Sequence, residues 1–243
     1  KDSIPCMNDT NTITIRPGAS VASVKNFTSS DTLGTFIFDS GSYFIFDGRP
    51  GGVGTNKYMQ IENTSLSGNA IFLKNKSNYN TFKYCTLKGV NNKQDEGVIN
   101  LQYIQGNYSP SFNTFSYCNI SDGGTTPTNL LYSKGYTSNN IYQDVYNYYE
   151  YKISMGNRIE FCNLSNFFNN NNYCNGIKLV EGNGNWVIKN SSFYQTANRT
   201  VTGNYVMTAI NIGQDKFGYV LGGDHEIRGN YIGGSQALCA GNK

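Results

Sequence analysis

Two aspartates stand where a site that cleaves polysaccharides would need them. Asp39 follows the apolar segment Thr35-Phe-Ile-Phe, and Asp47 follows the similar segment Tyr43-Phe-Ile-Phe. Glycoside hydrolysis uses two carboxyl groups about 5–9.5 Å apart across a cleft, and these two would meet if their segments formed stacked strands. The pattern favours the simpler interpretation, in which each aspartate is a polar residue that ends a strand at a turn.

A second acidic pair, Asp95-Glu96, lies close to Lys93 in the sequence. Carboxylates beside a basic residue are what a calcium-assisted lyase needs, but a solvated charged loop explains the same residues. His225 is the only histidine, and its place within a repeat favours a structural position over a Ser/His/Asp set. The sequence therefore predicts no catalytic residue, no metal site and no cofactor.

The strongest functional signal is a long insertion rich in tyrosine, from about residue 133 to 156. Sugars present apolar C–H faces that stack on aromatic rings, and tyrosine gives a large contact area at low entropic cost in protein binding as well. An equally simple interpretation is that the rings pack over the protein as a lid. The predicted ligand-binding residues are Tyr136, Tyr142, Tyr146, Tyr148, Tyr149 and Tyr151, with Tyr142, Tyr146, Tyr148 and Tyr149 preferred.

A repeated segment must position this insertion. It reads Asn80-Thr-Phe-Lys-Tyr-Cys-Thr-Leu87, and close copies begin at Asn113 and Asn157. Weaker copies begin at Asn185 and His225, so the starts lie 33, 44, 28 and 40 residues apart. Repeats of this length are typical of solenoids, whose unequal spacing reflects loops of different length.

Two apolar positions of the repeat, at offsets two and seven from its asparagine, are an odd number of residues apart. An unbroken strand would place them on opposite faces, so both point inward only if the chain bends between them. The residue at offset five is Cys or Asn, and Asn tolerates the left-handed conformation of a sharp bend. Further strand-like segments, such as Ala70-Ile-Phe-Leu73, lie between the copies. The sequence predicts an all-β fold, a right-handed parallel β-helix (solenoid) with long loop insertions.

Residues that recur at one position of the repeat should stack on successive turns about 4.8 Å apart. Cys85, Cys118 and Cys162 share such a position, and we expect buried free thiols there, with a single disulfide among them as the alternative. A straight column does not supply the convergent ligands of a metal site. The predicted structural ladder comprises Asn80, Asn113, Asn157, Asn185, Cys85, Cys118 and Cys162.

The composition fits one extended domain. Residues 1–34 are expected to form an entry or cap, residues 35–235 the turns, and residues 236–243 a tail. The net charge is only +3, and the sequence contains no cluster of Lys and Arg residues. Both observations argue against nucleic-acid binding. No run of about 18 apolar residues could span a bilayer, so no membrane insertion is expected. The chain begins at Lys1 without a hydrophobic leader, which favours a processed, exported product.

The repeat resembles that of pectate-lyase-like proteins and of copper-maturation periplasmic β-helix proteins. The segment Ser42-Tyr-Phe-Ile-Phe-Asp-Gly-Arg-Pro-Gly-Gly-Val-Gly54, together with the repeat, is also similar to large surface proteins of Bacteroidota. That resemblance implies export by the type IX secretion system and an adhesin-like role. No C-terminal sorting domain matches, which implies a piece of a longer chain. The calcium ligands and catalytic arginine of pectate lyases have no matching positions here.

These features predict a non-catalytic binding or adhesion module, secreted or at the cell surface, that recognises a glycan or a surface protein. Membership of a larger chain or assembly is compatible with this prediction. The first alternative is a polysaccharide lyase or hydrolase of the pectate-lyase type, which requires acidic and basic residues to converge in one groove. The second alternative is a structural spacer within a large surface protein, which uncapped ends of the coil would favour.

Overall fold

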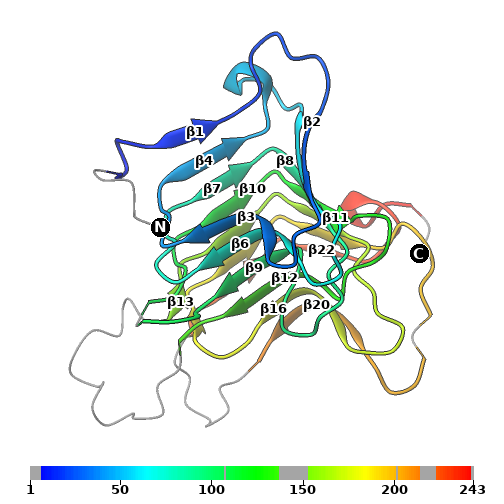
Figure 1. Ribbon diagram of the computed structural model, residues 1–243. Coiled ribbons are helices and arrows are strands. Elements are labelled where there is room, and N and C mark those ends of the chain that lie inside the picture. The colour runs from blue at the N-terminus through cyan, green and yellow to red at the C-terminus, as the bar shows by residue number, and fades with distance from the viewer. Residues whose placement is uncertain (1–6, 107, 137–152, 201, 214–222, 242–243) are drawn as a thin grey trace.

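The computed structural model describes residues 7–106, 108–136, 153–200, 202–213 and 223–241. Within these residues all strand pairings are parallel, and successive strands pass in turn through three long sheets. Figure 1 shows β1, β4, β7 and β10 stacked one beside the next along the coil. The chain is a parallel β-helix, which confirms the predicted fold class.

The coil has three sheets, which we name A, B and C, and each described turn contributes one strand to each of them, except that the last turn contributes only to sheets A and B. Sheet A contains β1 (Ile13–Ile15), β4 (Phe44–Asp47), β7 (Thr81–Lys83), β10 (Thr114–Ser116), β14 (Arg158–Glu160), β18 (Val187–Lys189) and β21 (Glu226–Arg228). Sheet B contains β2 (Lys25–Ser29), β5 (Met59–Asn63), β8 (Cys85–Gly89), β11 (Asn119–Asp122), β15 (Asn163–Ser165), β19 (Ser192–Tyr194) and β22 (Tyr231–Ile232). Sheet C contains β3 (Gly34–Asp39), β6 (Asn69–Lys74), β9 (Ile99–Gln102), β12 (Asn129–Lys134), β16 (Cys174–Leu179) and β20 (Met207–Ile212).

The inward side chains form columns that fill the coil. In sheet A the rings of Phe46, Phe82 and Phe115 stack with centroids 5.0 and 4.9 Å apart. Leu87, five residues after Phe82, is also fully buried in the same core. The chain therefore bends between offsets two and seven of the repeat, as the spacing required.

The bend lies one residue earlier than predicted. The left-handed residue is the aromatic one at offset four, with φ values of 53° at Tyr84, 55° at Tyr117 and 54° at Phe161. This conformation costs about 1–2 kcal/mol outside glycine. The three rings stack on one another outside the coil, with centroids 4.7 and 4.9 Å apart, and ring stacking offsets that cost.

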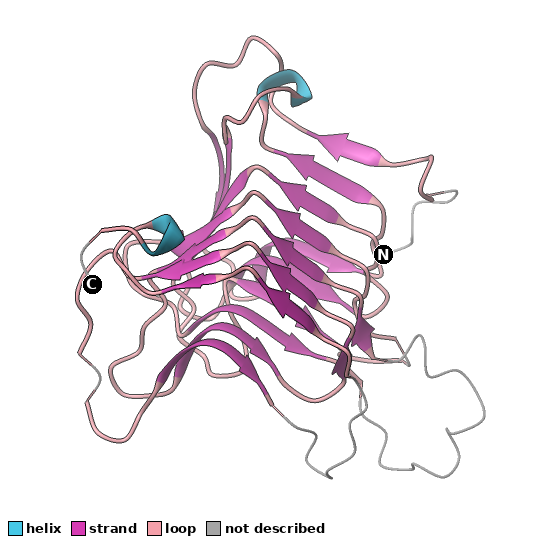
Figure 2. Cartoon of the chain, turned by 180° about the vertical axis from the view of Figure 1, so that it is seen from behind, coloured by secondary structure: helices cyan, strands magenta, loops and turns pink. Residues whose placement is uncertain are grey.

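Two short strands and two short helical turns complete the described structure. A small fourth sheet pairs β13 (Ser154–Met155) with β17 (Asn183–Gly184). The 3-10 turns η1 (Pro50–Gly52) and η3 (Ala237–Cys239) lie towards opposite ends of the coil, as Figure 2 shows. Both β1 and β2 fall within residues 1–34, the segment expected as the entry to the coil, so the described turns already begin there.

At the last turn, inward columns become exposed. Ile227 and Ile232 continue the columns of sheets A and B, yet 44% and 61% of their surfaces are accessible. The turn η3 covers part of sheet B, where the Leu238 N–H donates to Ser192 Oγ at 3.0 Å. No helix of the described chain is long and apolar enough to cross a membrane.

Candidate functional site

The asparagines of the repeat form a hydrogen-bonded column at the corner where sheet C leads into sheet A. Asn113 Oδ1 accepts from the backbone N–H and the side-chain Nδ2 of Asn80, both at 3.0 Å. Asn157 Oδ1 accepts from the same two groups of Asn113, at 2.9 and 3.0 Å. All three side chains are fully buried, so these bonds pair backbone groups that water cannot reach.

The fourth copy of the repeat is shifted by one residue from its predicted alignment. Arg158 pairs with Val187, so the residue that continues the column after Asn157 is Trp186. Asn185 is exposed and holds the left-handed bend before the strand, with φ of 50°. His225 continues the column after Trp186, and its Nδ1 accepts the Trp186 backbone N–H at 3.2 Å.

The three cysteines form a second column, just after the bend into sheet B. Cys85, Cys118 and Cys162 are buried free thiols. Cys162 Sγ accepts the Cys118 N–H at 3.4 Å, and the Cys118 thiol donates to the Phe82 carbonyl at 3.4 Å. Burial and a hydrogen bond with Cys118 raise the pKa of Cys162, so it remains a thiol, which is a poor nucleophile.

The two aspartates considered for hydrolysis lie on different sheets. Asp39 ends β3 of sheet C, where its Oδ2 is 3.2 Å from Lys74 Nζ. Asp47 ends β4 of sheet A, where Arg49 Nη2 lies 2.7 Å and Lys83 Nζ 3.4 Å from its Oδ2. Burial opposes ionisation of Asp47, but the hydrogen bonds from Arg49 and the charge of Lys83 hold its pKa below the usual value.

The other acidic residues are also spread over the coil. Asp122 ends β11 of sheet B, where it accepts from Asn166 Nδ2 at 2.9 Å. Glu96 pairs with Lys93 in the loop before β9, at 2.9 Å. In the part of the chain that the structure describes, no three His, Cys, Asp or Glu side chains gather around a possible metal ion.

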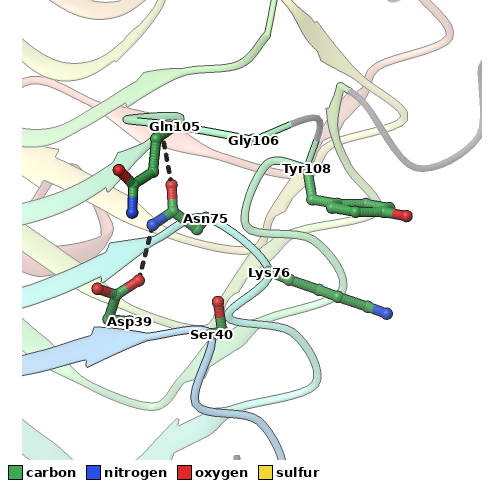
Figure 3. A pocket seen from close by; sticks show the side chains of 7 residues that line it. All are labelled: Asp39, Ser40, Asn75, Lys76, Gln105, Gly106 and Tyr108. Atoms are coloured by element: carbon green, nitrogen blue, oxygen red, sulfur yellow. Dashed lines mark hydrogen bonds between the residues drawn. The ribbon is translucent and has the colours of Figure 1, made fainter. Parts of the chain in front are cut away.

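The structure instead shows an open polar hollow at the corner that leads out of sheet C. Its volume is about 490 Å³, and three successive turns line it. Figure 3 shows its lining residues, which are Asp39, Ser40, Asn75, Lys76, Gln105, Gly106 and Tyr108. We call it the Asn75 hollow.

Asn75 joins the three turns that build this hollow. Its Nδ2 donates to Asp39 Oδ1 at 2.7 Å, and its Oδ1 accepts the backbone N–H groups of Ile104 and Gln105 at 3.2 and 3.0 Å. Asn75 itself is left-handed, with φ of 55°, a conformation that asparagine tolerates. The side chain of Asn75 therefore fixes both the Asp39 carboxylate and the loop that carries Gln105.

The mouth of the hollow carries a cation and a ring. Lys76 Nζ lies 5.1 Å from the centroid of the Tyr108 ring, which suits a cation–π contact. In Figure 3 both side chains extend away from the group formed by Asp39, Asn75 and Gln105. The hollow thus offers hydrogen-bond acceptors and donors inside and an aromatic surface at its edge.

The Asn75 hollow adjoins the base of the tyrosine-rich insertion. Tyr136, the first of the six predicted tyrosines, donates its backbone N–H to Ser109 Oγ at 2.8 Å. Its ring also meets the Tyr103 ring edge-on, with centroids 4.9 Å apart, and the Tyr103 hydroxyl donates to the Gly106 carbonyl at 2.7 Å. The other five lie outside the described residues: Tyr142, Tyr146, Tyr148, Tyr149 and Tyr151.

Sequence reasoning did not select Asn75, Lys76, Gln105 or Tyr108. None of them belongs to the repeated segment, because they follow the strands of sheet C, whose loops differ from turn to turn. One sequence signal for this site was available. The apolar strand ends in Lys74, so the polar residue that follows it is expected at a corner of the coil.

Comparisons with known proteins add no assignment. The chain matches no protein-family model, no curated protein and no solved structure.

Proposed function

We propose that this chain is a binding module for carbohydrate, and that the Asn75 hollow is its contact site. The observation that supports it is the convergence of a carboxylate, amides, an ammonium group and an aromatic ring in one open hollow of about 490 Å³. Sugar hydroxyls donate to and accept from such groups, and a ring at the edge covers apolar C–H faces. Ligand sites commonly combine a few fixed polar groups with aromatic walls.

The fixed geometry of the hollow favours binding over a purely structural role. Asn75 holds the Asp39 carboxylate and the Gln105 backbone before any ligand arrives, so little ordering entropy is lost on binding. Tyr136, the described tyrosine of the adjoining insertion, contacts Ser109 beside the hollow. An extracellular location and an adhesive role on a glycan-bearing surface fit this proposal, as does the resemblance to exported surface proteins.

The test is binding of the purified chain to a broad glycan array, followed by calorimetry on each hit. Tyr108→Ala should weaken binding by removing the ring, and Gln105→Ala by up to about tenfold through a lost hydrogen bond. Tyr173→Ala is the matched control, because Tyr173 is also an exposed tyrosine, at 52% against 42% for Tyr108, but lies outside the hollow. Equal losses in Tyr108→Ala and Tyr173→Ala would reject the Asn75 hollow as the site.

Product analysis on every hit separates binding from catalysis. The lyase or hydrolase alternative needs convergent acidic and basic groups, whereas Asp39, Asp47 and Asp122 end strands of three different sheets. Intact glycan after long incubation is the result that we expect, and shortened products would reject the non-catalytic proposal.

A structural spacer is the second candidate. The exposed Ile227 and Ile232 favour it, since solenoids need capping or continuation to cover inward columns. A spacer without its own ligand predicts an array with no hits. It also predicts that Tyr108→Ala has no effect on glycan binding, because there is no binding to lose.

A further inference from the structure

Two neighbouring cavities lie where sheet B leads towards sheet C in the last turns, away from the Asn75 hollow. The inner one has a volume of about 250 Å³ and is lined mainly by Phe167, Phe193, Met207, Ala209 and Ile232, with Gln195 in its wall. We call it the Gln195 cavity. An apolar cavity of about 150 Å³ already accommodates benzene, so this one can hold an aromatic ring with a short side chain.

A polar hollow of about 440 Å³ opens beside it, lined by Asn198 and Arg199 among others. Gln195, Met207 and Gly234 line both spaces, so the two are neighbours that share a wall. We call the outer space the Arg199 hollow. Together they form one site with an apolar inner part and a polar outer part.

Two polar atoms of this site have no hydrogen-bond partner among the described residues. Gln195 Nε2 donates to the Phe167 carbonyl at 2.8 Å, which fixes the amide and leaves Gln195 Oε1 buried and unpaired. The Nε of Arg199 is likewise buried and unpaired. A buried polar atom left without a partner destabilises the protein, so a ligand that supplies both partners is favoured.

The charge at the outer part is positive. The Arg199 guanidinium carbon lies 5.6 Å from the centroid of the Phe168 ring, and within the described residues no carboxylate is paired with this arginine. Guanidinium groups bind carboxylates with two parallel hydrogen bonds. The loop that carries these residues is fixed at its start, because Asn166 Oδ1 accepts the Thr196 N–H at 3.0 Å.

From these observations we infer a second ligand site, separate from the Asn75 hollow, for a small amphiphilic carboxylate. Its apolar part, about the size of a phenyl ring, occupies the Gln195 cavity. A hydrogen-bond donor on the ligand meets Gln195 Oε1, and the carboxylate meets Arg199. The inference does not depend on carbohydrate binding at the other site.

The methionines allow a direct test. The chain has four of them, and Met207 lines the cavity while Met59 is buried in the core. With ¹³C-methyl-methionine labelling, 3-phenyllactate should shift the Met207 signal saturably and leave the Met59 signal unchanged. The Met207→Leu variant assigns the signal. Absence of any Met207 shift at millimolar 3-phenyllactate would overturn the inference.

Two related probes test the polar contacts. The compound 3-phenylpropionate lacks the hydroxyl group, and 3-phenyl-1-propanol lacks the carboxylate. Affinity should fall in the order 3-phenyllactate, 3-phenylpropionate, 3-phenyl-1-propanol. Equal affinity of the last two would show that no anion is recognised, and would also overturn the inference.

Variants complete the test. Arg199→Gln should reduce affinity for 3-phenyllactate by at least about tenfold, because a charge-assisted contact is lost, and Ala209→Leu should do so by filling the cavity. Arg228→Gln is the matched control, an arginine outside both spaces whose partner is Glu226. Thermal melting shows which variants fold, and if Arg199→Gln does not, the probe series decides the question. Unchanged affinity in folded Arg199→Gln would contradict the assignment.

Discussion

Two columns of side chains, one of asparagine and one of cysteine, perform the same task at the two ends of the sheet A strands. The asparagine column makes bonds of 2.9–3.0 Å between turns, whereas the cysteine column makes contacts of about 3.4 Å. An amide supplies two donors and a strong acceptor, and a thiol only weak ones. The first corner therefore depends on polar bonding, and the second on packing of a small apolar side chain.

Replacing Asn113 with alanine should give the largest effect. The change leaves the Asn80 N–H without its acceptor and the Ser77 carbonyl without the Asn113 Nδ2 donor, at 2.9 Å. Two buried unpaired groups predict a loss of about 3 kcal/mol in the free energy of unfolding. Chemical denaturation measures it, with the exposed Asn26→Ala as control, and equal losses in the two variants would contradict a bonding role for the column.

Cys118→Ala should cost less, about 1 kcal/mol, because weaker bonds are lost. Cys118→Ser should cost less than Cys118→Ala. Serine already occupies the equivalent position two turns later, where Ser191 Oγ accepts the Cys162 N–H at 3.1 Å. The same denaturation experiment ranks the two variants, and a serine variant less stable than the alanine one would show that packing alone governs this corner.

The aromatic stack outside the cysteine column sharpens the comparison further. Tyr117→Ala should lose about 1–2 kcal/mol, since Tyr117 stacks on Tyr84 and on Phe161. Tyr117→Gly loses the same stacking but relieves the left-handed backbone, at φ of 55°. Glycine should therefore be more stable than alanine here, by about 1 kcal/mol, the reverse of their order in an ordinary strand. Equilibrium unfolding of Tyr117→Gly and Tyr117→Ala measures this difference, and an alanine variant that is the more stable of the two would contradict the prediction.

The smallest effect is expected at the end of the asparagine column, where His225 replaces asparagine. Burial lowers the pKa of His225 below its usual value, so the folded protein binds this proton less readily than the unfolded chain. Stability from the neutral ring is present above the unfolded pKa of about 6.5 and is lost as the pH falls below it. Unfolding measured between about pH 5 and 8 should show less pH dependence in His225→Asn, which keeps an acceptor for the Trp186 N–H. Identical pH profiles of stability in the wild-type protein and in His225→Asn would exclude the histidine ring as the source of the pH dependence.

The sequence predicted the coil because inward positions repeat with the same residue types on successive turns. It misaligned Asn185 because asparagine suits two neighbouring places, the column and the left-handed bend before it. It also placed the bend one residue late, since a tyrosine such as Tyr84 is not expected at positive φ unless a stacked ring supports it.

The Asn75 hollow was beyond sequence reasoning for a different reason. Asn75 and Gln105 are 30 residues apart, and their meeting depends on the length and path of loops that do not repeat. The tyrosine-rich insertion was predicted as a functional loop, and of its six predicted tyrosines only Tyr136 lies in the described structure. The prediction for the remaining tyrosines stands as made.

The direction of the inter-turn bonds has a mechanical consequence. Strands cross the axis of the coil, so their hydrogen bonds, and the bonds of the asparagine column, all run along it. A load along the axis therefore acts on the turns in series, and the weakest contact between turns opens first. Each turn released between these asparagines frees 33 to 44 residues, roughly 110–150 Å of extended chain at about 3.4 Å per residue. Under axial tension the coil would lengthen in steps, as an extensible tether that dissipates work one turn at a time.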